Sequence, residues 1–202
     1  MTLKRLLLLL LACGTLCIAP TLLFAHPLPH PKMQGGLGAG FLHPLLGLDH
    51  LLAMVGVGLW AAQQSNRRAV WVISAAFLGF MSIGFGLGVR SSALPLVELG
   101  IVASVALVGA LILFKRQVPL FVGTALAGLF AVFHGHAHGT DPAVGLSWLN
   151  FGVGFLLASG VLLVMGAAVW RIAERVTLQQ SVSRSAGGTL LTASSVFIVL
   201  LF

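Results

Sequence analysis

The stretch HPLLGLDHLLAMVGVGLWAA, residues 43–62, decides the fold class of this chain. It is apolar enough to lie within a lipid bilayer, yet it carries His43, Asp49 and His50. A charged aspartate at the centre of a membrane helix costs about 2.5 to 3.5 kcal/mol. Asp49 is therefore expected to face the interior of a helix bundle, or water, and to have a partner there.

The composition of the whole chain agrees with a membrane environment. Of its 202 residues 58% are hydrophobic and 7% are charged, and the mean hydropathy is +1.07. About a quarter of the residues of a soluble domain are charged. The formal charge of +7 comes from single or paired Lys and Arg between apolar segments, so no nucleic-acid partner is expected. The sequence predicts an all-α integral membrane protein with lipid as its surroundings.

The N-terminal segment has the pattern of an export signal. Residues 1–25 hold two cations, an apolar stretch and small residues before a cleavage site after Ala25, although an uncleaved first helix is the alternative. Residues 26–34 then form a periplasmic leader rich in His and Pro. Both cysteines, Cys13 and Cys17, precede the cleavage site, so the cleaved protein has no thiolate ligand for a metal.

One domain, residues 35–202, is expected to form a bundle of six transmembrane helices. Each apolar segment approaches the 20 or so residues that a helix needs to cross the hydrocarbon. The connections between them are short and hold most of the charge. The expected spans are 35–63, 69–89, 94–114, 119–138, 146–170 and 185–202.

Basic residues predict the orientation, since cytoplasmic loops carry an excess of Lys and Arg. The connections after the first, third and fifth spans hold seven of them: Arg67, Arg68, Lys115, Arg116, Arg171, Arg175 and Arg184. The other side holds only Lys32 and Arg90. These three connections are therefore expected in the cytoplasm, with the mature N-terminus and the C-terminus on the outer side of the membrane.

Histidines show a second asymmetry. The chain has seven, in the groups HPLPHPK, HPLLGLDH and HGHAHGTD, and the expected topology puts none of them at the cytoplasmic side. His43 and His50 are seven residues apart, about 10 Å on an ideal helix, which is too far for both to bind one ion. Pro44 disfavours helix at His43. The span is therefore expected to break near Pro44, or to form two successive stations, while Asp49 and His50 flank an ion between helices.

The motif HGHAH adds a pair with the spacing of metal ligands. On a helix His134 and His138 share one face about 6 Å apart, as the two histidines of HExxH zinc sites do. His136 points away from that face, unless Gly135 and Gly139 allow the last turn to unwind. Metal binding by His134 and His138 is expected, and by His136 if the turn unwinds.

The two membrane-embedded groups lie at similar depth in the outer half of the bilayer, so they can line one outward cavity. Glu98, at the outer start of the third span, is a further acid at that depth, or simply a residue that interacts with its helix dipole. An Asp49–His50 hydrogen bond with only a structural role is the plain alternative. His26 and His30 either capture a metal at the N-terminus or belong to a flexible leader.

Two long motifs, HPLLGLDHLLAMVGVGLWA and FHGHAHG, resemble those of the HupE/UreJ family of bacterial membrane proteins linked to hydrogenase and urease gene clusters. The resemblance extends to VELGIVAS (97–104) and to RSAGGTLLTASSVFIVLL in the last span. It implies a permease for nickel, or for cobalt, with a metal path through His43, Asp49, His50, His134, His136 and His138. It also implies a bacterial inner membrane, so that the mature N-terminus and the C-terminus are expected in the periplasm. Many members also have a histidine in the fifth helix, where this chain has none.

The expected function is transport of a divalent transition metal for hydrogenase or urease maturation. Nickel is the first choice, and cobalt and zinc are alternatives because imidazole and carboxylate suit all of them. No tightly bound cofactor and no enzyme activity are expected, and the oligomeric state is left open. The alternatives are a membrane metalloenzyme, or a metal-binding accessory or sensor subunit, with the same ligands.

Overall fold

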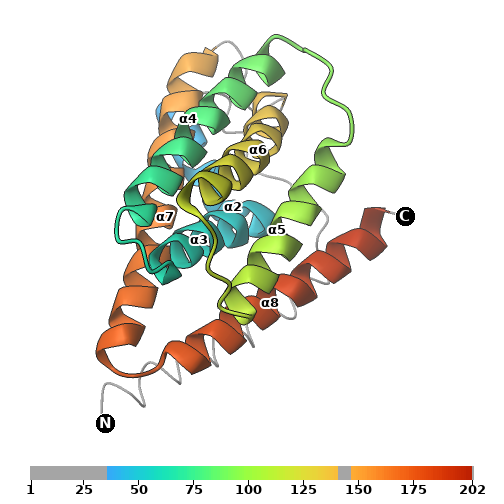
Figure 1. The fold of residues 1–202 in the computed structure, drawn as a ribbon. Coiled ribbons are helices and arrows are strands. Elements are labelled where there is room, and N and C mark those ends of the chain that lie inside the picture. Colours follow the sequence, from blue (N-terminus) through green and yellow to red (C-terminus); the bar gives the residue numbers. More distant parts are fainter. Residues whose placement is uncertain (1–35, 141–146, 202) are drawn as a thin grey trace.

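The computed structural model of the chain describes residues 36–140 and 147–201. Its regular structure in these ranges is helical throughout, as the sequence predicts (Figure 1). The helices are α2 (Gly36–Leu46), α3 (Leu48–Gln63), α4 (Ala69–Val89), α5 (Val97–Leu113), α6 (Leu120–Gly139), α7 (Trp148–Arg175) and α8 (Gln179–Leu201). The expected signal segment 1–25 and leader 26–34 lie outside the described residues.

Three described helices, α4, α6 and α7, are long and apolar enough to cross a membrane. The pair α2 and α3 meets the same criterion when it is taken together as one bent span, which makes four. Helix α5 is apolar but has 17 residues, about 25 Å, and α8 begins with the polar sequence QQSVSRS. The chain is thus a multi-pass membrane protein, while six full spans stay a prediction.

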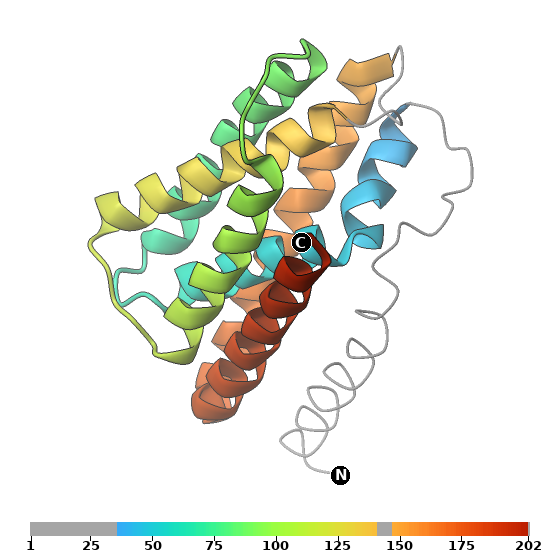
Figure 2. The same ribbon diagram turned by 90° about the vertical axis from the view of Figure 1, so that its right-hand side faces the viewer.

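The helices form three packed groups: α4 lies along α6, α2 and α3 lie along α7, and α5 lies along α8 (Figures 1 and 2). Figure 1 shows the α3–α4, α5–α6 and α7–α8 connections toward its lower end, and the start of α7 and the α4–α5 connection at its upper end. The basic connections therefore share one end of the bundle, as expected. Placing that end in the cytoplasm stays a prediction.

Glycines let these helices touch backbone to backbone. A Cβ on Gly84 of α4 would collide with the carbonyl of Val132 on α6, and a Cβ on Gly135 of α6 would collide with the carbonyl of Met81 on α4. Four further glycines join α7 to α2 and α3 in the same way: Gly40, Gly58, Gly154 and Gly166. Small residues that allow such close approach are typical of helix contacts in membranes.

The expected break in the first span is present, but it lies at Gly47 rather than at Pro44. Helix α2 continues through Pro44 to Leu46, and α3 starts at Leu48 at an angle of 81°. Gly47 has an extended backbone, with φ −89° and ψ 112°. Gly40, one turn before Pro44, packs closely on the α7 backbone, and α2 stays helical through the proline. This contact between helices outweighs the tendency of Pro44 to disfavour helix at His43.

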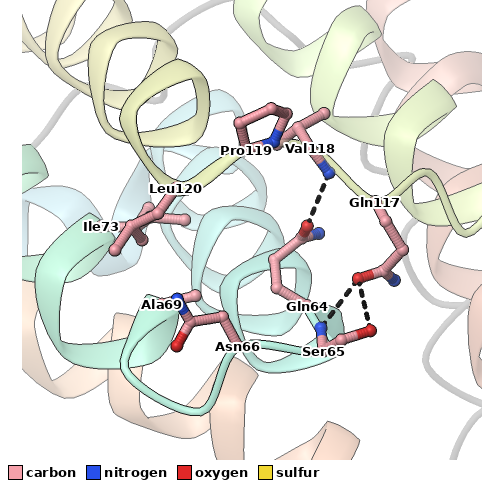
Figure 3. A pocket seen from close by; sticks show the side chains of 9 residues that line it. All are labelled: Gln64, Ser65, Asn66, Ala69, Ile73, Gln117, Val118, Pro119 and Leu120. Carbon is pink, nitrogen blue, oxygen red and sulfur yellow. Dashed lines mark hydrogen bonds between the residues drawn. The ribbon is translucent and has the colours of Figure 1, made fainter.

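At the lower end of the bundle, hydrogen bonds of two glutamines connect the α3–α4 and α5–α6 connections (Figure 3). Gln64 Oε1 accepts from the Val118 backbone N–H at 3.1 Å. Gln117 Oε1 accepts from the backbone N–H and the hydroxyl of Ser65, at 2.7 and 3.0 Å. These residues line a cavity of about 290 Å³. This cavity is at the end opposite the histidines, so it is not the outward cavity expected from the sequence.

Candidate metal site

Four imidazole rings from three helices meet in the interior of the bundle. The ring centroid of His138 on α6 lies 3.9 Å from that of His50 on α3 and 4.7 Å from that of His43 on α2. His134, one turn before His138, has its ring centroid 5.1 Å from that of His50. We call these four residues the histidine cluster. His138 contacts both rings of the broken span, so the break gives one contiguous cluster instead of two separate stations.

The turn between α2 and α3 and the helical periodicity of α6 explain why the four rings lie close together. The turn at Gly47 separates His43, in the last turn of α2, from His50, in the first turn of α3. Because α3 leaves at 81° to α2, the two rings approach α6 from different directions. On α6, His134 and His138 lie on one face, as their spacing predicts.

Burial removes the rings of α6 from solvent. His134 is fully buried, His138 is 2% exposed and His50 is 9% exposed, whereas His43 is half-buried. Phenylalanines line the cluster: the centroid of Phe155 is 4.1 Å from that of His138, and that of Phe151 is 5.4 Å from that of His43. The sequence analysis missed these α7 aromatics, because a phenylalanine in an apolar span carries no signal of its own.

His50 is the partner that the Asp49 carboxylate requires. Asp49 Oδ1 lies 2.9 Å from His50 Nδ1. A carboxylate only accepts, so Nδ1 of a neutral His50 carries the proton and Nε2 keeps its lone pair. Nε2 is buried and has no hydrogen-bond partner. A histidine oriented by a carboxylate, with its other nitrogen available, is the usual arrangement of a metal ligand.

The two cluster rings of α6 also have buried nitrogens without a partner. His134 Nε2 lies 2.8 Å from Ser104 Oγ on α5, and His134 Nδ1 is buried without a partner. His138 Nε2 is also buried without a partner. An unpaired buried polar atom costs about 1 to 3 kcal/mol. Three such nitrogens in one cluster are therefore the candidate ligand atoms of this site.

The distances between the rings of the cluster suit a bound cation, but the ring nitrogens do not point to one common position. Two imidazoles that bind one ion at right angles, each with N–metal bonds of 2.0 to 2.1 Å, keep their centroids about 4.5 Å apart. The observed centroid distances of 3.9, 4.7 and 5.1 Å bracket that value. In the described residues, however, no three His, Cys, Asp or Glu side chains have their atoms arranged to hold a metal ion. Rotation of rings is needed to bring their nitrogens to one point.

Other residues predicted for the metal path lie outside the cluster. His136 Nε2 lies 2.7 Å from the carbonyl oxygen of Ser92 in the α4–α5 connection, to which a protonated Nε2 donates. Helix α6 does not unwind as considered above, because it continues to Gly139. Glu98 is exposed on the first turn of α5. His26 and His30 lie outside the described residues.

Comparison with known proteins gives a consistent result. The sequence model described as HupE / UreJ protein matches residues 14–197. Protein HupE of Rhizobium leguminosarum bv. viciae is 37% identical over 180 residues, which cover 89% of this chain and 92% of that protein. No solved structure matches. Both the extent of the family match and the identity to this relative show that the chain belongs to the HupE/UreJ family.

Proposed function

We propose that this protein transports a divalent transition-metal ion, Ni²⁺ first and Co²⁺ next, across the bacterial inner membrane to supply hydrogenase or urease maturation. Family membership supports nickel or cobalt transport in an accessory role, and the chain is not an enzyme. The observation that carries the proposal for this chain is the histidine cluster. Three of its buried nitrogens, His50 Nε2, His134 Nδ1 and His138 Nε2, lack a hydrogen-bond partner, and they belong to helices of a multi-pass membrane protein.

The composition of the cluster supports both the binding and the release of a cation. His43, His50, His134 and His138 are neutral ligands when deprotonated, and Asp49 supplies one negative charge beside them. Zn²⁺ and Cu²⁺ also bind imidazole well, so selection for nickel depends on coordination geometry as well as on ligand type. A site with a single carboxylate neutralises a divalent ion only in part, which favours its release.

The membrane potential provides a driving force for uptake. Each elementary charge that enters a cell gains about 2.3 kcal/mol per 100 mV, so a divalent ion gains about twice that. The sequence has no GxxxxGK[ST] motif for nucleotide binding. Uptake driven by the potential is therefore the simplest mechanism for this chain.

The proposal predicts that cells expressing the protein accumulate labelled nickel, and that Asp49→Asn reduces this accumulation at least tenfold. The substitution keeps the shape of the side chain but removes the charge beside His50 Nδ1. Ser82→Ala is the matched control, because Ser82 is exposed and its hydroxyl bonds only to its own helix. Equal uptake by wild type and Asp49→Asn at equal expression would overturn the proposal.

Competition separates the metals and the alternative functions. Unlabelled cobalt is expected to compete with nickel more strongly than manganese does, and a protonophore that collapses the potential is expected to slow uptake. A metalloenzyme would show turnover without net accumulation. A sensor or accessory subunit would bind nickel when purified, but membrane vesicles that contain it would accumulate no nickel.

A further inference from the structure

Ser104 of α5 places its hydroxyl on an imidazole of the histidine cluster. The side chain is 3% exposed, and its Oγ lies 2.8 Å from His134 Nε2. The same Oγ lies 2.6 Å from the carbonyl oxygen of Ile101 in its own helix. Ser104 thus connects α5 to the cluster, although neither metal chemistry nor helix periodicity singles it out in the sequence.

Counting protons fixes the roles of these atoms. A serine hydroxyl has one proton to donate and two lone pairs to accept with. The Ile101 carbonyl oxygen can only accept, so a contact of 2.6 Å requires the serine proton to lie between the two oxygens. Ser104 therefore has only lone pairs left for His134, and His134 Nε2 must be the donor.

This proton position determines which atom of His134 is available to a ligand. A neutral imidazole with its proton on Nε2 has its lone pair on Nδ1. His134 Nδ1 is the nitrogen that is buried without a hydrogen-bond partner. His50 is held in the opposite sense, with its proton on Nδ1 toward Asp49 and its lone pair on Nε2.

We propose that Ser104 is a positioning residue, which holds His134 in the form protonated at Nε2 so that Nδ1 binds the transported cation. The inference rests on the proposed transport function. Ser104 acts through His134 and does not itself contact the ion. Asp49 and Ser104 then each orient one of two neighbouring rings. Asp49 orients His50 with a charged acceptor, and Ser104 orients His134 with a neutral acceptor.

A neutral partner at His134 limits the strength of the site. A carboxylate raises the basicity of the imidazole that it orients, whereas a hydroxyl mainly fixes its orientation. A second carboxylate at position 104 would add negative charge and slow the release of the ion. The use of serine instead of aspartate therefore suits a site that must pass its cargo on.

The first test is the position of the proton in purified, metal-free protein with ¹⁵N-labelled histidine. The ¹⁵N shifts of a protonated and an unprotonated ring nitrogen differ widely, and loss of a signal in His134→Gln assigns His134. We expect Nε2 of His134 to be protonated in wild type and in Ser104→Thr, which keeps the hydroxyl. Ser104→Ala should give a mixture of both forms.

The second test is the concentration dependence of nickel uptake. Ser104→Ala is expected to raise the KM about 10- to 100-fold, the usual effect of removing a group that orients a metal ligand. Ser104→Thr should stay within about threefold of wild type. Ser159→Ala is the matched control, because Ser159 is fully buried on α7 and its hydroxyl donates only to Phe155 of its own helix; its KM should equal that of wild type.

These two measurements separate the inference from the proposed function. A proton on His134 Nδ1 in wild type, or an unchanged KM in Ser104→Ala, would overturn the role of Ser104 while transport stands. Protonation at Nε2 together with no nickel uptake by wild type would instead overturn the transport function.

Discussion

The ring centroids of His50 and His138 lie 3.9 Å apart, although one ring belongs to the broken first span and the other to the end of α6. His138 is also 4.7 Å from His43, on the other side of the break. The His138 ring of the HGHAH motif therefore contacts both α2 and α3, the two halves of the broken first span. The proposed cation site therefore involves α6 and the broken span together.

The central position of His138 makes its loss more harmful than that of His43. We expect His138→Gln to raise the KM for nickel uptake at least tenfold and by more than His43→Gln, since His43 is half-buried at the edge of the cluster. Uptake at a series of nickel concentrations measures both values, with protein amounts checked by immunoblotting. A smaller effect at His138 than at His43 would contradict the central role of His138.

His136 is expected to matter less than its neighbours in the same motif. Its Nε2 lies within hydrogen-bond distance of the Ser92 carbonyl oxygen, and its role in the structure is to hold the α4–α5 connection. We predict that His136→Gln changes the KM for nickel less than threefold, while His134→Gln changes it at least tenfold. The same uptake assay compares the two variants. A larger increase in KM for His136→Gln than for His134→Gln would contradict this prediction and support a role of His136 in metal binding.

Two glycines of α4, two residues apart, provide a matched test of the helix packing. Gly84→Ala is expected to destabilise the protein by about 1 to 3 kcal/mol, because its Cβ would collide with the Val132 backbone of α6. Gly86→Ala should be neutral or slightly stabilising, since a Cβ there meets nothing within 4 Å. Thermal unfolding in detergent compares them, and equal melting temperatures would contradict the packing described here.

The glutamine at the end of α3 is expected to stabilise the opposite end of the bundle. Gln64 is 6% exposed and bonds to Val118 N–H and to the carbonyl oxygen of Arg116. Gln64→Ala leaves the Arg116 and Val118 backbone groups without these partners and should cost about 1 to 3 kcal/mol. Gln180→Ala is the control, because Gln180 is exposed and accepts only from Lys115; unfolding of both variants in detergent measures the difference.

The sequence predicts the parts of the site that follow from local spacing. The i, i+4 relationship of His134 and His138 requires only a helix, and a carboxylate in an apolar span requires only a partner. Both are present in the structure. That His43 and His50 cannot share an ion on an intact helix leaves two alternatives, a break near Pro44 or two successive stations, and the structure has a break.

The remaining features depend on contacts between helices, which a single sequence does not reveal. The break lies at Gly47 and not at Pro44, because α2 stays helical through the proline where it packs on the α7 backbone. Ser104 looks like any small residue of a membrane helix until α6 is placed beside it. His136 is turned toward a carbonyl oxygen of a connection whose course the sequence does not fix.

Glycine contacts fasten α4 to α6 backbone against backbone, and they do the same for α7 with α2 and α3. Each assembly is therefore stiff within itself, because no flexible side chains separate its helices at these points. The histidine cluster lies across the joint between these two assemblies: His134 and His138 come from one, His43 and His50 from the other. A ligand that contacts rings of both assemblies would connect them, and a movement of one assembly relative to the other would separate these rings.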